Sequence, residues 1–131
     1  MKKGKLSIIV GIVALLLFML SGYLLVYMND FAAGQALKES LGDKGHKLTV
    51  IAHAHGNLFA LMNIIIGILL SKFDVETKAC KGIATLGLLG FLMPLGILGK
   101  VFLNLTPIII FFGEISMIGA FAWLLIKILK N

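Results

Sequence analysis

The 131-residue sequence has few charged residues, one cysteine, two prolines and no arginine. Charged residues make up only 14% of the chain and hydrophobic residues 60%, with a mean hydropathy of +1.05. A soluble domain of this length keeps much of its surface in water and cannot hide so much apolar surface. The composition therefore predicts a protein dissolved in the lipid bilayer, and the length suits a single domain over residues 1–131.

The scarcity of cysteine and the absence of arginine exclude several function classes. Cys80 alone can form neither an intrachain disulfide nor a CxxC metal site. The net charge is +6, but the lysines gather at the ends of apolar runs. Nucleic-acid binding is typical of a basic stripe with interleaved aromatic residues and arginine forks, which this sequence lacks. We therefore expect no nucleic-acid partner.

Four apolar runs are long enough to cross a bilayer, which takes about 20 residues. They cover residues 6–28, 48–70, 82–103 and 107–126. The first run follows MKKGK, as a secretory signal would, but it is longer than a signal h-region and lacks an A-x-A cleavage site, which favours a retained helix. The predicted fold is all-α: a four-helix bundle that spans the cell membrane four times.

The distribution of lysine predicts the orientation of the spans. With the N-terminus inside, eight lysines lie on the cytoplasmic side (positions 2, 3, 5, 72, 78, 81, 127 and 130) and four on the other (38, 44, 47 and 100). Because lysine is enriched in cytoplasmic loops, this asymmetry predicts that both termini are cytoplasmic.

Local signals predict the connections and bends. Asn29-Asp30 can begin a short helix that Gly42 ends, and Thr106 can cap a helix whose first residue is Pro107. Pro94 is expected to kink the third span and to free a carbonyl near Gly90. Small residues four apart predict close helix packing in three spans; the pairs are Ser7/Gly11, Gly56/Ala60 and Ser116/Ala120.

The second span carries four polar side chains, at His53, His55, Asn57 and Asn63. At about 100° per residue, His53, Asn57 and Asn63 fall within one arc of roughly 120°, together with small residues, and this arc should face the bundle. His55 lies about 200° from His53. It is expected to meet a neighbouring chain, to reach towards the outer headgroups or to border the bundle from the side.

Glu114, in the fourth span, carries the strongest single signal. A carboxyl group in hydrocarbon is costly and usually faces a cavity or a partner. Counted from the outer ends of their helices, Tyr23, His53 and Glu114 lie at about the same depth. We therefore predict a polar network in the outer leaflet, in which His53 and Glu114 approach each other or share a ligand. The alternative is a structural hydrogen bond that orders the bundle. The residues of this network are Tyr23, His53, Asn57, Asn63 and Glu114.

The stretch His53-Ala54-His55-Gly56-Asn57-Leu58 resembles the His-Ala-His-x-Asn-Leu motif of small stand-alone membrane proteins related to cytochrome oxidase subunit I. The resemblance implies a haem iron ligand at His53 or His55. The small relatives carry a further histidine in their third helix, whereas ATLGLLGFLMPLG has none. A haem would then need methionine, an open sixth position or a second subunit. A weaker resemblance is to the hydroxylaminobenzene mutase group.

Three functions remain open at this point. The first is cofactor binding, with haem at His53 or His55 and redox or gas chemistry. The second is a small-molecule isomerase in which His53 and Glu114 act as acid and base, as the mutase resemblance implies. The third is a non-enzymatic assembly or transport subunit, acting as a homo-oligomer or within a larger membrane complex, in which the polar residues only fix helix register.

Overall fold

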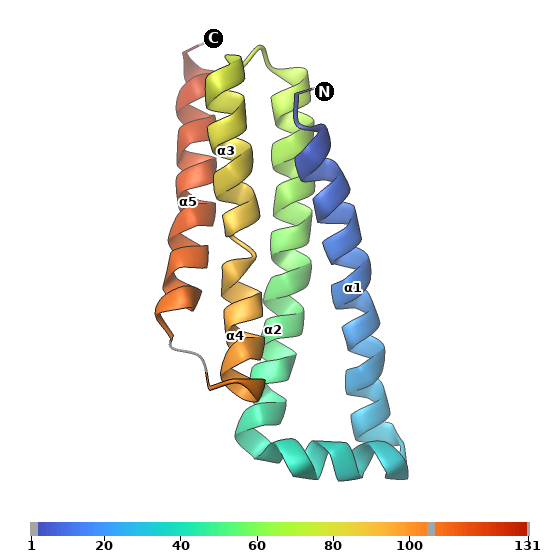
Figure 1. The fold of residues 1–131 in the computed structure, drawn as a ribbon. Helices are drawn as coiled ribbons and strands as arrows, with labels where there is room; N and C mark the ends of the chain where they lie inside the picture. Colours follow the sequence, from blue (N-terminus) through green and yellow to red (C-terminus); the bar gives the residue numbers. More distant parts are fainter. Residues whose placement is uncertain (1–2, 105–106, 131) are drawn as a thin grey trace.

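The structure, a computed structural model, describes residues 3–104 and 107–130. All regular secondary structure in these ranges is helical, which confirms the predicted all-α class. The helices are α1 (Lys5–Asp30), α2 (Ala32–Lys72), α3 (Thr77–Leu89), α4 (Leu92–Phe102) and α5 (Ile108–Leu129). α4 continues the direction of α3, so the bundle consists of four rods, and α1 begins at the end of the bundle where α5 ends (Figure 1).

Each of the four rods is long and apolar enough to cross a bilayer. α1, α2 and α5 cover nearly all of the three spans predicted for them. The third rod begins at Thr77, earlier than the predicted residue 82, because helical hydrogen bonding starts inside the charged connection: the Cys80 N–H donates to the Glu76 carbonyl at 2.8 Å. The connection between α2 and α3 is therefore shorter than the sequence predicts.

The predicted short helix is present as the first part of α2, residues 32–41. The predicted cap at Asn29-Asp30 is wrong, because both residues belong to the last turn of α1, where Asn29 Nδ2 donates to the Leu25 carbonyl, and the N-cap of α2 is Phe31. This part lies across the lower end of the bundle in Figure 1, and the chain then turns into the long rod. The turn occurs at Gly42, whose φ of 68° and ψ of 168° belong to a region that is essentially restricted to glycine. The prediction that Gly42 ends this helix is confirmed as a sharp kink.

The third rod is interrupted between α3 and α4, as the proline signal predicts. Pro94 has no N–H, so it cannot donate to the carbonyl of Gly90 four residues earlier. That carbonyl is nevertheless not free, which corrects the prediction: it accepts the N–H of Met93 at 3.0 Å in a tighter turn. The predicted cap at Thr106 lies outside the described residues, and Pro107 directly precedes α5.

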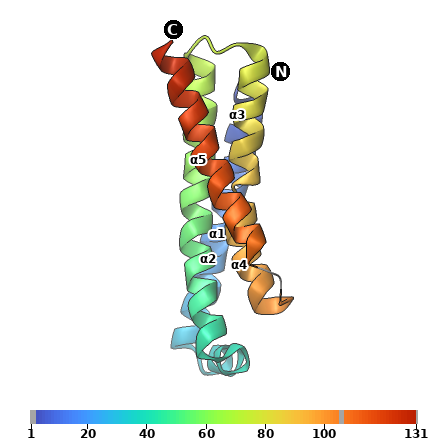
Figure 2. The same cartoon turned by 90° about the vertical axis from the view of Figure 1, so that its left-hand side faces the viewer.

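Close packing is greatest between α1 and α2, where small residues meet. Ser7, Gly11, Gly56 and Ala60 are all buried, which confirms packing at two of the predicted pairs. In the third pair Ala120 is buried but Ser116 is not. α5 packs mainly on α3 and α4 and runs obliquely towards α4 at its N-terminal end (Figure 2).

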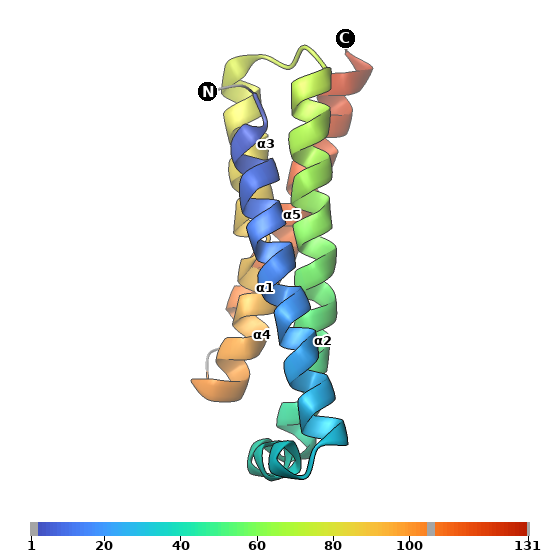
Figure 3. The ribbon, with the colours of Figure 1, turned by 90° about the vertical axis from the view of Figure 1, so that its right-hand side faces the viewer.

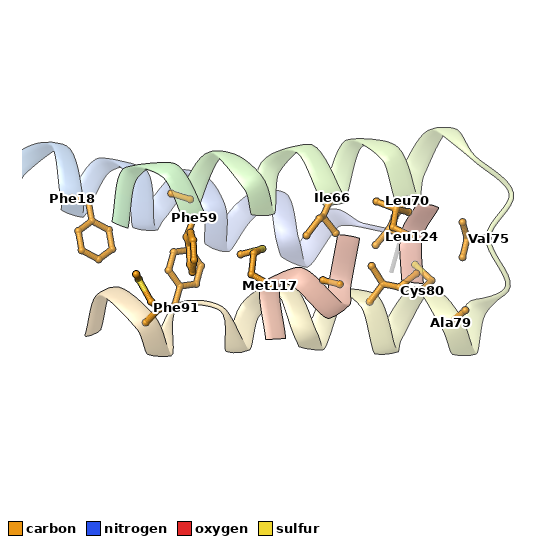
Figure 4. Close-up of a cluster of buried hydrophobic side chains, with 14 of the residues drawn as sticks. Phe18, Phe59, Ile66, Leu70, Val75, Ala79, Cys80, Phe91, Met117 and Leu124 are labelled. Atoms are coloured by element: carbon orange, nitrogen blue, oxygen red, sulfur yellow. The ribbon is translucent and has the colours of Figure 1, made fainter. Parts of the chain in front are cut away.

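The core cluster fills the space between α2, the α3–α4 rod and α5. Phe59, Phe91 and Met117 lie together in its middle, and Val75 closes it at the end near the α2–α3 connection (Figure 4). These side chains are at most 9% exposed. In contrast, most large side chains of α1 point outward, so α1 contributes little to this core beyond Phe18.

Candidate functional site

His53 lies in the contact between α1 and α2. Its Nδ1 is 2.7 Å from the carbonyl oxygen of Phe18 and 3.0 Å from Oγ of Ser21. A carbonyl oxygen can only accept, so Nδ1 carries the proton and donates to Phe18. The ring also covers Gly22, where an added Cβ would come within 2.8 Å of Cε1. The prediction that His53 faces the bundle is confirmed, and its neighbour is α1.

Asn57 occupies the other side of the same ring. Its Nδ2 donates to the His53 backbone carbonyl at 3.1 Å and lies 3.3 Å from Nε2 of the His53 ring. The same Nδ2 lies 3.4 Å from Nδ1, so it is almost equidistant from the two ring nitrogens and rests against the ring rather than along the Nε2 lone pair. Nδ1 of His53 is therefore hydrogen-bonded to α1, and Nε2 lies against the Asn57 amide. Asn57 Oδ1 is buried without a hydrogen-bond partner among the described residues.

Asn63 forms a second polar contact, between α2 and α3. It is completely buried, and its Nδ2 donates to the Gly87 carbonyl at 2.9 Å and to the Phe59 carbonyl at 3.0 Å. Its Oδ1 faces Gly87 so closely that a Cβ there would lie at 2.9 Å. Asn63 thus joins α2 to α3 just before the break at Gly90, separately from His53.

The predicted network of Tyr23, His53 and Glu114 is not formed. Tyr23 is 74% exposed on the outside of α1, and Glu114 is exposed on α5, which packs mainly on α3 and α4. His53 instead contacts α1. The prediction was based on equal depth, and depth alone does not fix the direction in which each helix turns its side chains.

His55 and Glu114 occupy comparable positions at the edge of the core. On α2, His55 shares a helix face with Leu48 and Met62, which are partly buried against the core cluster. On α5, Glu114 shares a helix face with Phe121, which is also partly buried against this cluster. The His55 ring meets the edge of the Phe59 ring at a centroid distance of 6.4 Å. Of the sequence alternatives for His55, the structure favours a position bordering the bundle from the side.

The surroundings of His55 leave one ring nitrogen available. Its Nδ1 donates to the Ile51 carbonyl of its own helix at 3.0 Å, so Nε2 carries the free lone pair. No hydrogen-bond partner of Nε2 is found in residues 3–104 and 107–130, and none is found there for the Glu114 carboxyl group. His55 is half-buried and Glu114 is exposed.

The residues around His53 do not fit a haem. Iron would have to bind Nε2, but that nitrogen lies against Asn57 Nδ2 and about 3.3 Å from the position of a Cβ on Gly22. His55 offers a free Nε2, yet neither histidine lines the three cavities described below. Within the described parts of the chain, no group of three or more His, Cys, Asp and Glu residues could hold a metal ion.

The sequence reasoning missed Ser21 and the carbonyl of Phe18 as partners of His53. Ser21 Oγ donates to the same carbonyl at 2.6 Å, so this oxygen accepts from both side chains. A serine within an apolar run is a weak signal, and nothing in the sequence pairs it with a histidine 32 positions away. The rotation of α1 against α2 brings them together.

Among the cavities that border the described part of the bundle, three are large. A cavity of about 620 Å³ lies between the start of α1 and α3, and one of about 410 Å³ lies between α1 and α4. The third, of about 520 Å³, lies beside the kink at Gly42 and is lined by polar and charged side chains. α1, which forms a wall of the first two cavities, lies at the front in Figure 3.

Comparison with known proteins gives no relative: the chain matches no protein-family model, no curated protein and no solved structure.

Proposed function

We propose that the protein is a non-enzymatic integral membrane subunit that associates with copies of itself through the edge formed by α2 and α5. Its four rods cross the bilayer, with both termini on the cytoplasmic side as the lysine distribution predicts. The observation that carries the proposal is the exposed carboxyl group of Glu114 on an apolar helix.

The interior polar groups support a structural role. Nδ1 of His53 is used in the α1–α2 contact, Nε2 lies against Asn57 of the same helix, and the amide nitrogen of Asn63 is used in the α2–α3 contact. The hydrogen-bond donors of both side chains are thus used within the bundle. An acid–base reaction between His53 and Glu114 is also disfavoured, because these side chains lie on different faces of the bundle.

The carboxyl group of Glu114 has no hydrogen-bond or ion-pair partner among the described residues. It lies about two turns into α5, which places it in the hydrocarbon region of a bilayer. Ionisable side chains within spans almost always face a bundle interior, a water-filled cavity or a partner, because the cost at a helix centre is about 2.5–3.5 kcal/mol on insertion scales. An exposed Glu114 therefore calls for a hydrogen-bonding partner on another polypeptide at the same depth.

His55 of a second copy meets this requirement. His55 lies one helical turn from Phe59, and Glu114 lies about one turn from Met117 in the same direction along the bundle; Phe59 and Met117 lie near each other in the middle of the core cluster (Figure 4). The imidazole and the carboxyl group are therefore at the same level. An oligomer with its symmetry axis along the bilayer normal keeps every residue at its own depth, so a twofold contact can join each Glu114 to the other copy's Nε2.

The test is self-association in lipid vesicles, measured by energy transfer between donor- and acceptor-labelled chains as the protein is diluted with lipid. We expect Glu114→Leu to weaken association, because the side chain can no longer hydrogen-bond. Interhelical hydrogen bonds in membranes contribute about 0.6–1.7 kcal/mol, or about 3- to 16-fold in affinity for each of the two contacts. Glu114→Gln should retain most of the association, since its amide can donate to Nε2.

The matched control is Glu39→Gln, which removes an exposed carboxylate outside the long rods. His55→Leu should reproduce the loss seen in Glu114→Leu, and the double variant should lose little more than either single variant. A wild-type chain that is monomeric at all dilutions would overturn the proposal. So would Glu114→Leu associating as strongly as Glu39→Gln.

A further inference from the structure

The two cavities beside α1 lie end to end along one face of the bundle. The lining residues of the α3–α4 rod recur every three or four positions and form a continuous stripe: Thr77, Lys81, Ala84, Leu88, Phe91, Leu95 and Leu98. α1 supplies the opposite wall, from Leu6 through Val10 and Ala14 to Phe18. We call this feature the α1 groove.

The α1 groove is polar and basic at one end and apolar along the rest. Lys3, Lys81 and Thr77 line the end at which α1 and α3 begin, whereas the cavity between α1 and α4 is lined almost wholly by hydrocarbon. No aspartate or glutamate lines either cavity. Lys3 bonds Asp74 at 3.0 Å, but no described acidic group lies within ion-pair distance of Lys81.

This distribution matches an amphiphile with an anionic head and a long hydrocarbon tail. An unpaired lysine at a bilayer surface attracts anionic headgroups, and basic pockets between spans hold phosphate-bearing lipids. A bound peptide helix would have to present a continuous apolar face to the groove. Such a helix would supply no anionic group for the lysine end of the groove. The apolar stripe extends along the rod from Ala84 to Leu98. Because the rod crosses the bilayer, the stripe is roughly parallel to the lipid acyl chains.

We propose that the α1 groove binds an anionic phospholipid of the leaflet on the side of the termini, with its phosphate beside Lys3 and Lys81 and one acyl chain between α1 and the α3–α4 rod. The inference rests on the membrane location proposed above. It is independent of self-association, because His55 and Glu114 do not line the groove.

The experiment uses native mass spectrometry of the full chain in detergent. The chain is titrated with phosphatidylglycerol or with phosphatidylcholine of the same acyl chains. We expect phosphatidylglycerol to bind in preference, and Lys81→Gln to lower its affinity about fivefold while leaving phosphatidylcholine unchanged. Lys72→Gln is the matched control, because Lys72 is an exposed lysine at the same end and lines neither cavity.

A second variant tests the apolar part of the groove. Ala84→Phe places a ring between α1 and α3 and should lower the binding of both lipids, whereas Ala122→Phe on the exposed face of α5 should not. Bound phosphatidylglycerol should also slow the reaction of Cys80, which lines the groove, with N-ethylmaleimide.

Equal retention of the two lipids, or equal effects of Lys81→Gln and Lys72→Gln, would overturn the proposal. Glu114→Leu, which tests the self-association, is expected to bind phosphatidylglycerol as the wild type does. A failure of one proposal is therefore distinguishable from a failure of the other.

Discussion

Replacing Gly113 by alanine tests the contact between α4 and α5. A Cβ on Gly113 would lie 2.2 Å from the backbone nitrogen of Met93 and 2.8 Å from its Cα. Ordinary contact for a Cβ begins at 3.4 Å, so α5 must move away from α4 by about 1 Å. The obstacle is backbone at the start of α4, which cannot rotate aside as a side chain can.

The expected cost follows from comparison with a second glycine of the same helix. At Gly119 an added Cβ would meet only Leu86 Cδ1, at 3.7 Å, which is an ordinary contact. Both substitutions gain about 1 kcal/mol of helix propensity, so this contribution cancels in the comparison. Overpacking costs about 1–3 kcal/mol. The free energy of unfolding of Gly113→Ala should therefore be lower than that of Gly119→Ala by about this amount.

Cys80 provides the assay, because it is the sole cysteine and is 5% exposed. When opening is in fast equilibrium with closing, the rate of thiol labelling follows the open population. A difference of 1–3 kcal/mol corresponds to about 5- to 140-fold faster labelling of Gly113→Ala than of Gly119→Ala. Labelling at equal rates would refute the reasoning, since it would mean that α4 and α5 do not approach this closely.

Two further predictions concern the α2–α3 contact and the kink of α2. Asn63→Leu should lower the unfolding free energy by about 0.6–1.7 kcal/mol, because the bond to the Gly87 carbonyl is lost; faster Cys80 labelling would show it, and an unchanged rate would contradict the role of Asn63. Gly42→Ala should cost about 1–3 kcal/mol through backbone strain alone, since an added Cβ meets nothing within 4 Å. Thermal unfolding in detergent measures this change, and Gly119→Ala again serves as the strain-free control.

The candidate site could be predicted only in part. The direction of His53 followed from helical periodicity, because the polar and small side chains near it share one face of α2. Its partners on α1 could not be predicted, since they depend on how two apolar helices rotate against each other. For Glu114, equal depth suggested a layer shared with His53, but the contact with His53 was wrong because α5 packs on α3 and α4 and turns Glu114 outward.

The sequence by itself determined the local features: four apolar rods, the kink at Gly42 and the break before Pro94. Each depends on the composition of a single segment or on the backbone freedom of one residue, and needs no knowledge of neighbouring helices. Tertiary structure alone decided which side chains meet. Helices without a strong polar stripe can pack in several rotations of similar energy, and small residues such as Gly22 and Gly113 select among them by close approach. That selection places the His53 ring against α1 and leaves Glu114 at the edge of the bundle.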